Sequence, residues 1–111
     1  MIKLIQDNLD KIHELCERFH VKRLEVFGSA SDGRFEPGRS DIDFIVEFEP
    51  LDWEKHAEAF LGLLAALEDL LPVEIDLNTE PPVERRNPYF WSEVAKSRRV
   101  IYERRHQEVP V

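Results

Sequence analysis

Apolar residues follow a helical pattern in two stretches of the chain, which predicts amphipathic helices over 2–18 and 52–71. In the second one, a wide leucine-rich stripe is expected to pack in the core. A third helix is expected over 88–97, because Asn87 and Pro88 are typical of a helix start: asparagine caps free amides and proline suits the first helical position.

Four other stretches combine β-forming residues with turn signals or strict alternation, which predicts strands. They are 24–27, 41–48, 73–78 and 100–102. The second strand alternates between an apolar face, Ile42, Phe44, Val46 and Phe48, and an acid-bearing face, Asp41, Asp43, Ile45 and Glu47. The segment 29–40 predicts a loop or one helical turn. The order of elements predicts an α/β (α+β) fold, a small mixed sheet with helices packed on its apolar face.

The length of 111 residues fits one domain, which we expect over 1–102, followed by a charged tail over 103–111. No apolar run approaches the length needed to cross a bilayer, and the first residues lack the long apolar core of a leader peptide. These observations favour a cytoplasmic protein without membrane association. Cys16 is the single cysteine, so we expect a buried thiol and no internal disulfide.

Charge is distributed unevenly along the chain. The formal net charge is −8, which argues against direct binding to nucleic acid because that affinity depends on Lys and Arg. Residues 1–82 hold 8 basic and 19 acidic side chains, whereas residues 83–111 hold 7 basic and 4 acidic ones. The arginines of the second segment fit two interpretations, a solvated surface or a face directed at an anion.

Asp41 and Asp43 are the candidate residues with the clearest chemistry. Because they lie two apart on a predicted strand, both carboxylates project from one face, with Cβ atoms about 6 to 7 Å apart. Two such acids repel each other, and a Mg²⁺ ion between them would favour their ionised forms. Asp76 lies on the polar face of a later strand and would complete the set, with Glu74 as its rival. The alternative is a strand edge with solvated acids.

Gly28 and Ser29 end the first strand, and the short connection to Asp41 allows the turn and the carboxylates to lie on adjacent strands. Glycine lets the backbone approach closely, while amides of the following turn and the Ser29 hydroxyl can donate to phosphate oxygens. Three carboxylates beside such a turn can hold two metal ions, one on a triphosphate and one activating an attacking hydroxyl. Asp41 and Asp43 would bridge both ions. Asp76 would serve the second ion and could accept or orient the hydroxyl proton.

These residues resemble the signature of the polymerase-β nucleotidyltransferase superfamily. The resemblance rests on Phe27-Gly28-Ser29-Ala30 and Ser40-Asp41-Ile42-Asp43-Phe44-Ile45-Val46-Glu47-Phe48, with further similarity at 73–77, 87–90 and 100–102. It implies the fold of that superfamily, catalysis and metal binding by the three aspartates, ATP as substrate and two Mg²⁺ ions. It also implies nucleotide contacts from Gly28, Ser29, Arg34 and Ser40.

The resemblance is strongest to the minimal, stand-alone members of the superfamily, and this has implications for function. Such members are often paired with a small helical toxin of the HEPN type, to which they transfer AMP from ATP. The implied function is therefore an antitoxin that silences its partner by modifying a tyrosine hydroxyl. A second hypothesis is a catalytically silent, nucleotide-binding antitoxin that neutralises its partner by direct contact. A homo-oligomer is compatible with either.

Two further features of the sequence bear on the site. Many minimal members carry an Arg-Gly pair soon after the Gly-Ser turn, whereas here Gly33 precedes Arg34. Arg34 or Arg39 could supply the positive charge for a triphosphate, and either could equally lie on the loop surface. Outside the site, Trp53 and Trp91 are expected to pack at helix starts.

Overall fold

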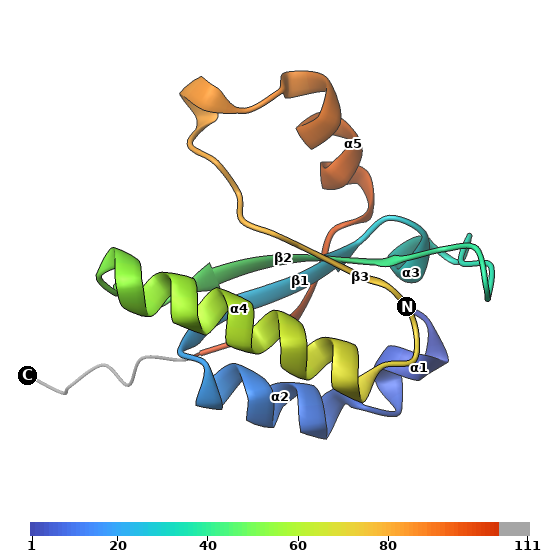
Figure 1. Cartoon of the computed structure of the whole chain (residues 1–111). Helices are drawn as coiled ribbons and strands as arrows, with labels where there is room; N and C mark the ends of the chain where they lie inside the picture. Colours follow the sequence, from blue (N-terminus) through green and yellow to red (C-terminus); the bar gives the residue numbers. More distant parts are fainter. Residues whose placement is uncertain (105–111) are drawn as a thin grey trace, which may run out of the picture.

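The computed structural model describes residues 1–104, in which four strands form one sheet (Figure 1). The strands are β1 (Val21–Phe27), β2 (Ile42–Phe48), β3 (Ile75–Asn78) and β4 (Arg99–Glu103). Their order is β3-β2-β1-β4, with β1 antiparallel to β2 and β4, and β2 parallel to β3. Helix α4 (Trp53–Leu70) supplies the crossover that the parallel pair requires. This mixed sheet confirms the predicted fold class.

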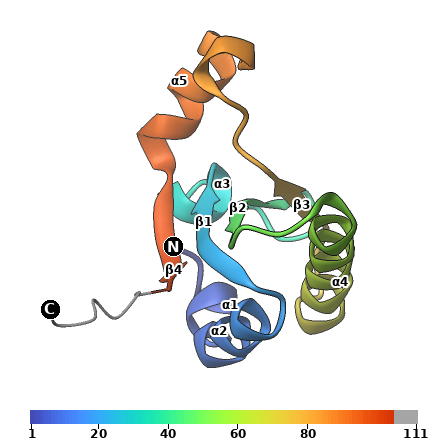
Figure 2. The same ribbon diagram turned by 90° about the vertical axis from the view of Figure 1, so that its left-hand side faces the viewer.

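One face of the sheet carries the main core. Helices α1 (Lys3–Gln6), α2 (Leu9–Arg18) and α4 cover this face, as Figure 2 shows. Fully buried residues from these helices and from the sheet include Ile12, Cys16, Leu24, Phe44, Leu63 and Leu67. The apolar face predicted for the second strand is thus in the core, as is most of the stripe of the long helix. The prediction for Leu61, which the stripe included, is wrong, since its side chain is 63% exposed. Burial raises the pKa of the Cys16 thiol to about 12 and keeps it protonated.

The single helix predicted over 2–18 is wrong, because the chain forms α1 and α2 there, separated by a turn at Asn8. The Asn8 backbone leaves the helical region (φ −113°, ψ 11°), and its side-chain amide donates to the Leu4 carbonyl at 2.8 Å. Asparagine competes for backbone groups in this way and is disfavoured inside helices. Ile5 and Ile12, on either side of the break, are both fully buried.

Helix α5 (Pro88–Ser97) packs on the opposite face of the sheet, which the apolar pattern did not predict. Its Trp91 and Val94 contact Phe27 and Ile45 in a second, smaller cluster of buried residues. Alternation places Ile45 correctly on the acid-bearing face, and the side chain is only 4% exposed there because α5 covers it. A single apolar residue on that face therefore serves as the docking point for a helix.

The starts of the two longer helices follow the predicted signals. The Asp52 carboxylate caps α4, and the Asn87 side chain caps α5 by accepting from the amides of its first turn, with Pro88 in the first helical position. Trp91 is buried as predicted, but the prediction for Trp53 is wrong, since its side chain is 79% exposed. Trp53 is the first residue of α4, beyond the end of β2.

The last segments of the chain include a short 3-10 helix, η1 (Val83–Arg85), between β3 and α5. Strand β4 continues to Glu103, so the tail predicted over 103–111 begins within a strand, and 105–111 lies outside the described residues. Within residues 1–104, no helix combines the length and apolarity required to span a membrane.

Gly62 provides a test of how closely α4 packs against the end of α2. A Cβ atom at position 62 would lie 2.5 Å from the ring of Phe19. Alanine favours a helix interior over glycine by about 1 kcal/mol, whereas overpacking costs about 1 to 3 kcal/mol. Gly62→Ala should therefore lower the free energy of unfolding by about 1 kcal/mol in urea titrations. In a Phe19→Ala background the same change should be stabilising, and destabilisation there would contradict this packing.

Candidate active site

The register of the sheet brings the candidate residues side by side. Phe27 pairs with Asp43 across the antiparallel pair β1–β2, and Asp43 pairs with Asp76 across the parallel pair β2–β3. Gly28 directly follows Phe27, and Asp41 immediately precedes β2, two residues before Asp43. The Gly28 turn and the three aspartates, Asp41, Asp43 and Asp76, therefore lie at one end of the sheet.

The half-buried Asp43 carboxylate lies at the centre of this group, and its pKa is raised to about 6. Desolvation is the largest cause, followed by the negative charge of Asp76, a hydrogen bond with the Asp76 carboxyl group and the charge of Asp41. Glu74 has no part in this effect. It lies with Asp41 on the wall of a neighbouring hollow of about 640 Å³. Asp76, rather than Glu74, is the acid that contacts Asp43.

Gly28 is needed where it stands because the backbone passes against Asp43. Its dihedral angles, φ 70° and ψ −150°, lie in a region that side-chain-bearing residues rarely adopt. A Cβ atom there would lie 3.0 Å from Oδ2 of Asp43. The Gly28 amide donates to the Ser97 hydroxyl at 2.8 Å, so it is already engaged within the protein. Gly28 therefore contributes close approach to the carboxylates, and phosphate donors must come from the residues after it.

Those residues form the one-turn helix α3 (Ser29–Asp32). The Gly28 carbonyl accepts from the amides of Ser31 and Asp32 at 3.0 and 3.1 Å, which closes the turn. The amides of Ser29 and Ala30 begin the helix and have no acceptor within it. Together with the Ser29 hydroxyl, they are the donors that this turn can offer to an anion beside Asp43.

The two other candidate nucleotide contacts are engaged elsewhere. Arg34 is exposed and forms an ion pair with Asp32 at 2.7 Å, which places it at the end of α3. The Ser40 hydroxyl accepts from the Glu36 amide at 3.0 Å and closes the loop that precedes Asp41. These contacts limit where both side chains can point, although the Ser40 hydroxyl still has its own hydrogen to donate.

The donor set suits a divalent cation without forming a closed metal site. Within residues 1–104, no three His, Cys, Asp or Glu side chains stand close enough to enclose a metal ion. Asp43 and Asp76 nevertheless supply adjacent hard oxygen ligands, which Mg²⁺ prefers. A cation would also relieve the repulsion that contributes to the raised pKa of Asp43. Asp41 is exposed, so its side chain is accessible to a cation.

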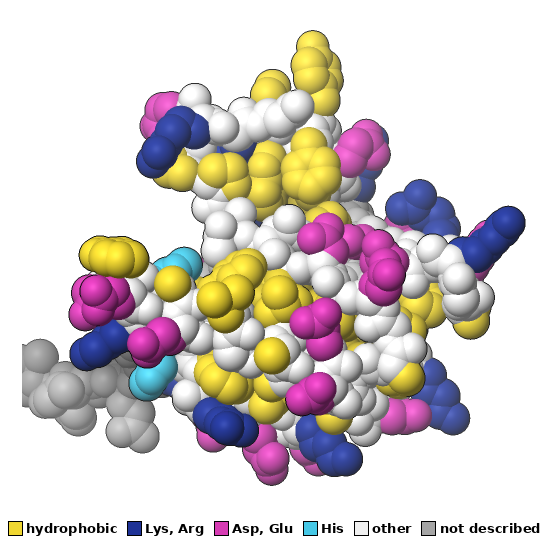
Figure 3. Space-filling model, viewed as in Figure 1, with side chains coloured by type: hydrophobic (Ala, Val, Ile, Leu, Met, Phe, Trp, Pro, Cys, Tyr) yellow, Lys and Arg dark blue, Asp and Glu magenta, His cyan; other side chains and the backbone are white. Residues whose placement is uncertain are grey.

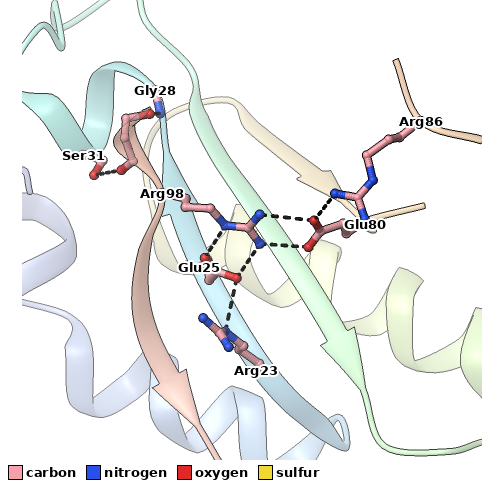
Figure 4. A network of polar contacts seen from close by, with 8 residues as sticks. Arg23, Glu25, Gly28, Ser31, Glu80, Arg86 and Arg98 are labelled. Carbon is pink, nitrogen blue, oxygen red and sulfur yellow. Dashed lines mark hydrogen bonds and ion pairs between the residues drawn. The ribbon is translucent and has the colours of Figure 1, made fainter. Parts of the chain in front are cut away.

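A network of arginines and glutamates holds the segment between β3 and β4 to the sheet (Figure 4). Arg98 donates to both carboxylate oxygens of Glu25 at 2.8 Å and also to Glu80 at 2.8 and 3.2 Å. Arg86 donates to the same Glu80 at 2.9 Å, and Arg23 lies 3.2 Å from Glu25. Sequence reasoning missed this network and left these arginines as solvated surface or anion contacts. The signal available in the sequence was an acidic residue, Glu25, inside the short apolar strand predicted over 24–27, and the structure buries this side chain to 4% exposure.

The network borders a groove of about 580 Å³ between the sheet and the segment that leads to α5. Ile45, two residues beyond Asp43 on the same face of β2, lies in its wall, as do Pro81 and Pro82. In Figure 3, acidic side chains gather below the apolar side chains of the α5 region. Exposed residues of that region include Val83 (70%), Tyr89 (84%) and Phe90 (47%). The Phe90 ring packs edge-on against Phe27, which pairs with Asp43, so exposed apolar side chains lie next to the acidic site.

Comparison with known proteins identifies the family. The family model described as "Nucleotidyltransferase domain" matches residues 10–105, which is most of the chain and includes the turn and all three aspartates. This chain belongs to the nucleotidyltransferase domain family. No curated protein matches it.

Solved structures share the fold of this nucleotidyltransferase. A protein that carries the provisional description of a minimal nucleotidyltransferase is 28% identical, with a TM-score of 0.59 over 87% of this chain and 94% of the other. A toxin–antitoxin structure with AMP-PNP is 23% identical (TM-score 0.56, 87% and 74% coverage). A mutant of the toxin–antitoxin pair MntA–HpeT is 21% identical (TM-score 0.56, 87% and 74%). The last two comparisons establish a common fold.

The raised pKa of Asp43 predicts that this residue destabilises the nucleotidyltransferase in the absence of metal. Between about pH 4 and 6, native Asp43 retains a proton that the unfolded chain has lost, so the free energy of unfolding falls as the pH rises through this window. Asp43→Asn should therefore gain stability between pH 4 and 6 and keep a gain of about 1 kcal/mol above pH 7, allowing for solvent screening. Urea titrations in EDTA from pH 4 to 8 measure this, with Glu47→Gln as an exposed control. A gain that does not depend on pH would contradict the assignment.

The Arg98 network predicts a large effect of removing one charge. Arg98→Met leaves the buried Glu25 carboxylate without its bidentate partner and should lower the free energy of unfolding by about 3 to 5 kcal/mol. Replacing Glu25 by Met as well should recover most of this loss. The exposed neighbour Arg99 is the matched control, and Arg99→Met should change the stability by less than about 0.5 kcal/mol. Equal effects of the two single substitutions in thermal unfolding would argue against a buried network.

Proposed function

We propose that this nucleotidyltransferase transfers AMP from ATP to a hydroxyl group of a partner protein in a Mg²⁺-dependent reaction. The observation that carries the proposal is the contact between Asp43 and Asp76 directly beside Gly28 and the start of α3. Carboxylates for a metal and backbone donors for phosphate lie together, as nucleotidyl transfer requires. The family membership supports the same class of reaction.

The reaction assigns a task to each part of the site. The hydroxyl oxygen of the acceptor would attack the α-phosphorus of ATP, and the bond from that phosphorus to the β-phosphate oxygen would break. AMP would remain on the acceptor, pyrophosphate would leave, and the hydroxyl proton would pass to a carboxylate, for which Asp76 is the candidate. Mg²⁺, held by Asp41, Asp43 and Asp76, would neutralise phosphate charge. Ser29 and the first amides of α3 would orient the triphosphate.

A protein acceptor fits the surroundings of the site. The apolar side chains of Val83, Tyr89 and Phe90 are exposed, and the Phe90 ring packs edge-on against Phe27, the strand partner of Asp43. Exposed apolar surfaces of this kind typically bind proteins. The groove beside Ile45 has a volume in the range of ligand sites and could receive the segment that carries the hydroxyl. Similarity to antitoxin-containing structures supports a toxin as the partner, and we propose that it is of the HEPN type.

The experiment that tests this proposal follows the label of [α-³²P]ATP into a purified HEPN-type partner protein in the presence of Mg²⁺. The unchanged chain should transfer label, and EDTA should abolish the transfer. Asp43→Asn should reduce the rate at least about 100-fold, because metal coordination supplies several kcal/mol of transition-state stabilisation. Glu54→Gln, which changes an exposed acid in the first turn of α4 beyond the end of β2, should have no effect.

Two results would redirect the proposal. Inhibition of the partner by the Asp43→Asn variant, with no label transferred by the unchanged chain, would support the catalytically silent antitoxin that acts by contact. Label transfer that survives Asp43→Asn would remove the aspartates from the reaction. Binding of Mg²⁺·ATP should in either case be measured separately by calorimetry.

A further inference from the structure

Ser97, the last residue of α5, connects that helix to the turn after β1. Its hydroxyl oxygen accepts the hydrogen bond from the Gly28 amide at 2.8 Å, and its backbone carbonyl accepts from the Ser31 hydroxyl (Figure 4). The contacts bridge 69 and 66 positions of sequence. One residue of α5 therefore holds both the glycine before α3 and a serine within α3.

These contacts act on the part of the turn that faces the carboxylates. Gly28 is conformationally free in the unfolded chain and adopts an unusual backbone conformation here, so an anchor on its amide selects that conformation. Without the Ser97 hydroxyl, the amide would lack its acceptor within the protein, and the turn could rotate away from Asp43. The amides of Ser29 and Ala30 would move with it.

Ser97 can hold the turn in place only if its own position is fixed, and contacts of the next residue fix it. The amide of the next residue, Arg98, donates to the Val94 carbonyl at 3.0 Å and closes the end of α5. The Arg98 guanidinium is fixed to Glu25 of β1 by two hydrogen bonds. Because β1 leads directly into Gly28, strand, turn and helix end form a closed loop of contacts.

We infer that Ser97 is a positioning residue for the nucleotide, which holds the Gly28–Ser29 turn in the conformation that binds the triphosphate. This inference rests on the proposed function, because it assumes that the turn binds phosphate. Ser97 acts through the turn and does not contact the substrate. Its loss should therefore weaken nucleotide binding more than it slows the transfer step.

The test compares Ser97→Ala with Ser97→Thr and with Ser92→Ala, an exposed serine of the same helix. Calorimetry with Mg²⁺·ATP should show a dissociation constant about five- to tenfold higher for Ser97→Ala, corresponding to one lost hydrogen bond. Ser97→Thr keeps the hydroxyl and should bind nearly as the unchanged chain does, as should Ser92→Ala. In label transfer, Ser97→Ala should raise KM for ATP by the same factor and change kcat by less than about twofold.

The outcomes separate this inference from the function on which it rests. Equal Mg²⁺·ATP affinity of the unchanged chain and of Ser97→Ala, alongside weakened binding by Ser29→Ala, would overturn the inference and leave the proposed function standing. A loss in Ser97→Ala that Ser97→Thr does not restore would also overturn it, because the hydroxyl would then not be the cause. No binding by the unchanged chain would overturn both. Faster hydrogen exchange of the Gly28 amide in Ser97→Ala alone would support the inference independently of activity.

Discussion

The register of β2 between β1 and β3 is the constraint on which the site depends. It pairs Phe27 with Asp43 and Asp43 with Asp76, and so places the turn and two carboxylates in one row. A slip by one residue would exchange the faces and send Asp43 into the core. Phe44, fully buried one residue later, opposes such a slip. The same alternation that builds the core therefore aligns the acids.

A second constraint is the attachment of the segment between β3 and β4 to the sheet. The chain from Glu80 to Arg98 leaves the sheet, forms η1 and α5, and returns as β4. The Trp91 cluster and the contacts of Arg98 with Glu25 and Glu80 fix it at several points. Arginine suits this position because its planar fork can serve two carboxylates at once, which the single ammonium of lysine does less well. Through Ser97, this anchoring reaches the Gly28 turn.

The sequence was informative wherever a local pattern determines structure. Periodicity located the long helices and the strands, and the Asn87-Pro88 pair located the start of α5. The break at Asn8 was missed because the apolar spacing continues across it. The Arg98–Glu25 pair and the Ser97 contacts were missed for another reason. They join positions 66 to 73 residues apart, and no short-range pattern records such a contact.

At the site, the sequence predicted which residues lie close together. It did not predict which of their polar atoms are free to bind a ligand. Alternation and turn signals are enough to bring Gly28 and Asp43 to neighbouring strands. Whether a polar atom is available to a ligand depends on its folded partners, and here the single N–H of Gly28 is already bonded to Ser97. Periodicity carries no information about such competition.

Stability and chemistry oppose each other at Asp43. Folding places this carboxylate in partial burial beside two other acids, which raises its pKa and weakens the fold near neutral pH in the absence of a cation. Bound Mg²⁺ would reverse the sign of this effect, since the field that disfavours the bare carboxylate favours a cation among the three acids. The buried core and the Arg98 network must therefore hold the strands in register against this repulsion. If the three acids came together only when metal was present, each binding event would have to order the strands and the Gly28 turn. The free energy of that ordering would weaken nucleotide binding.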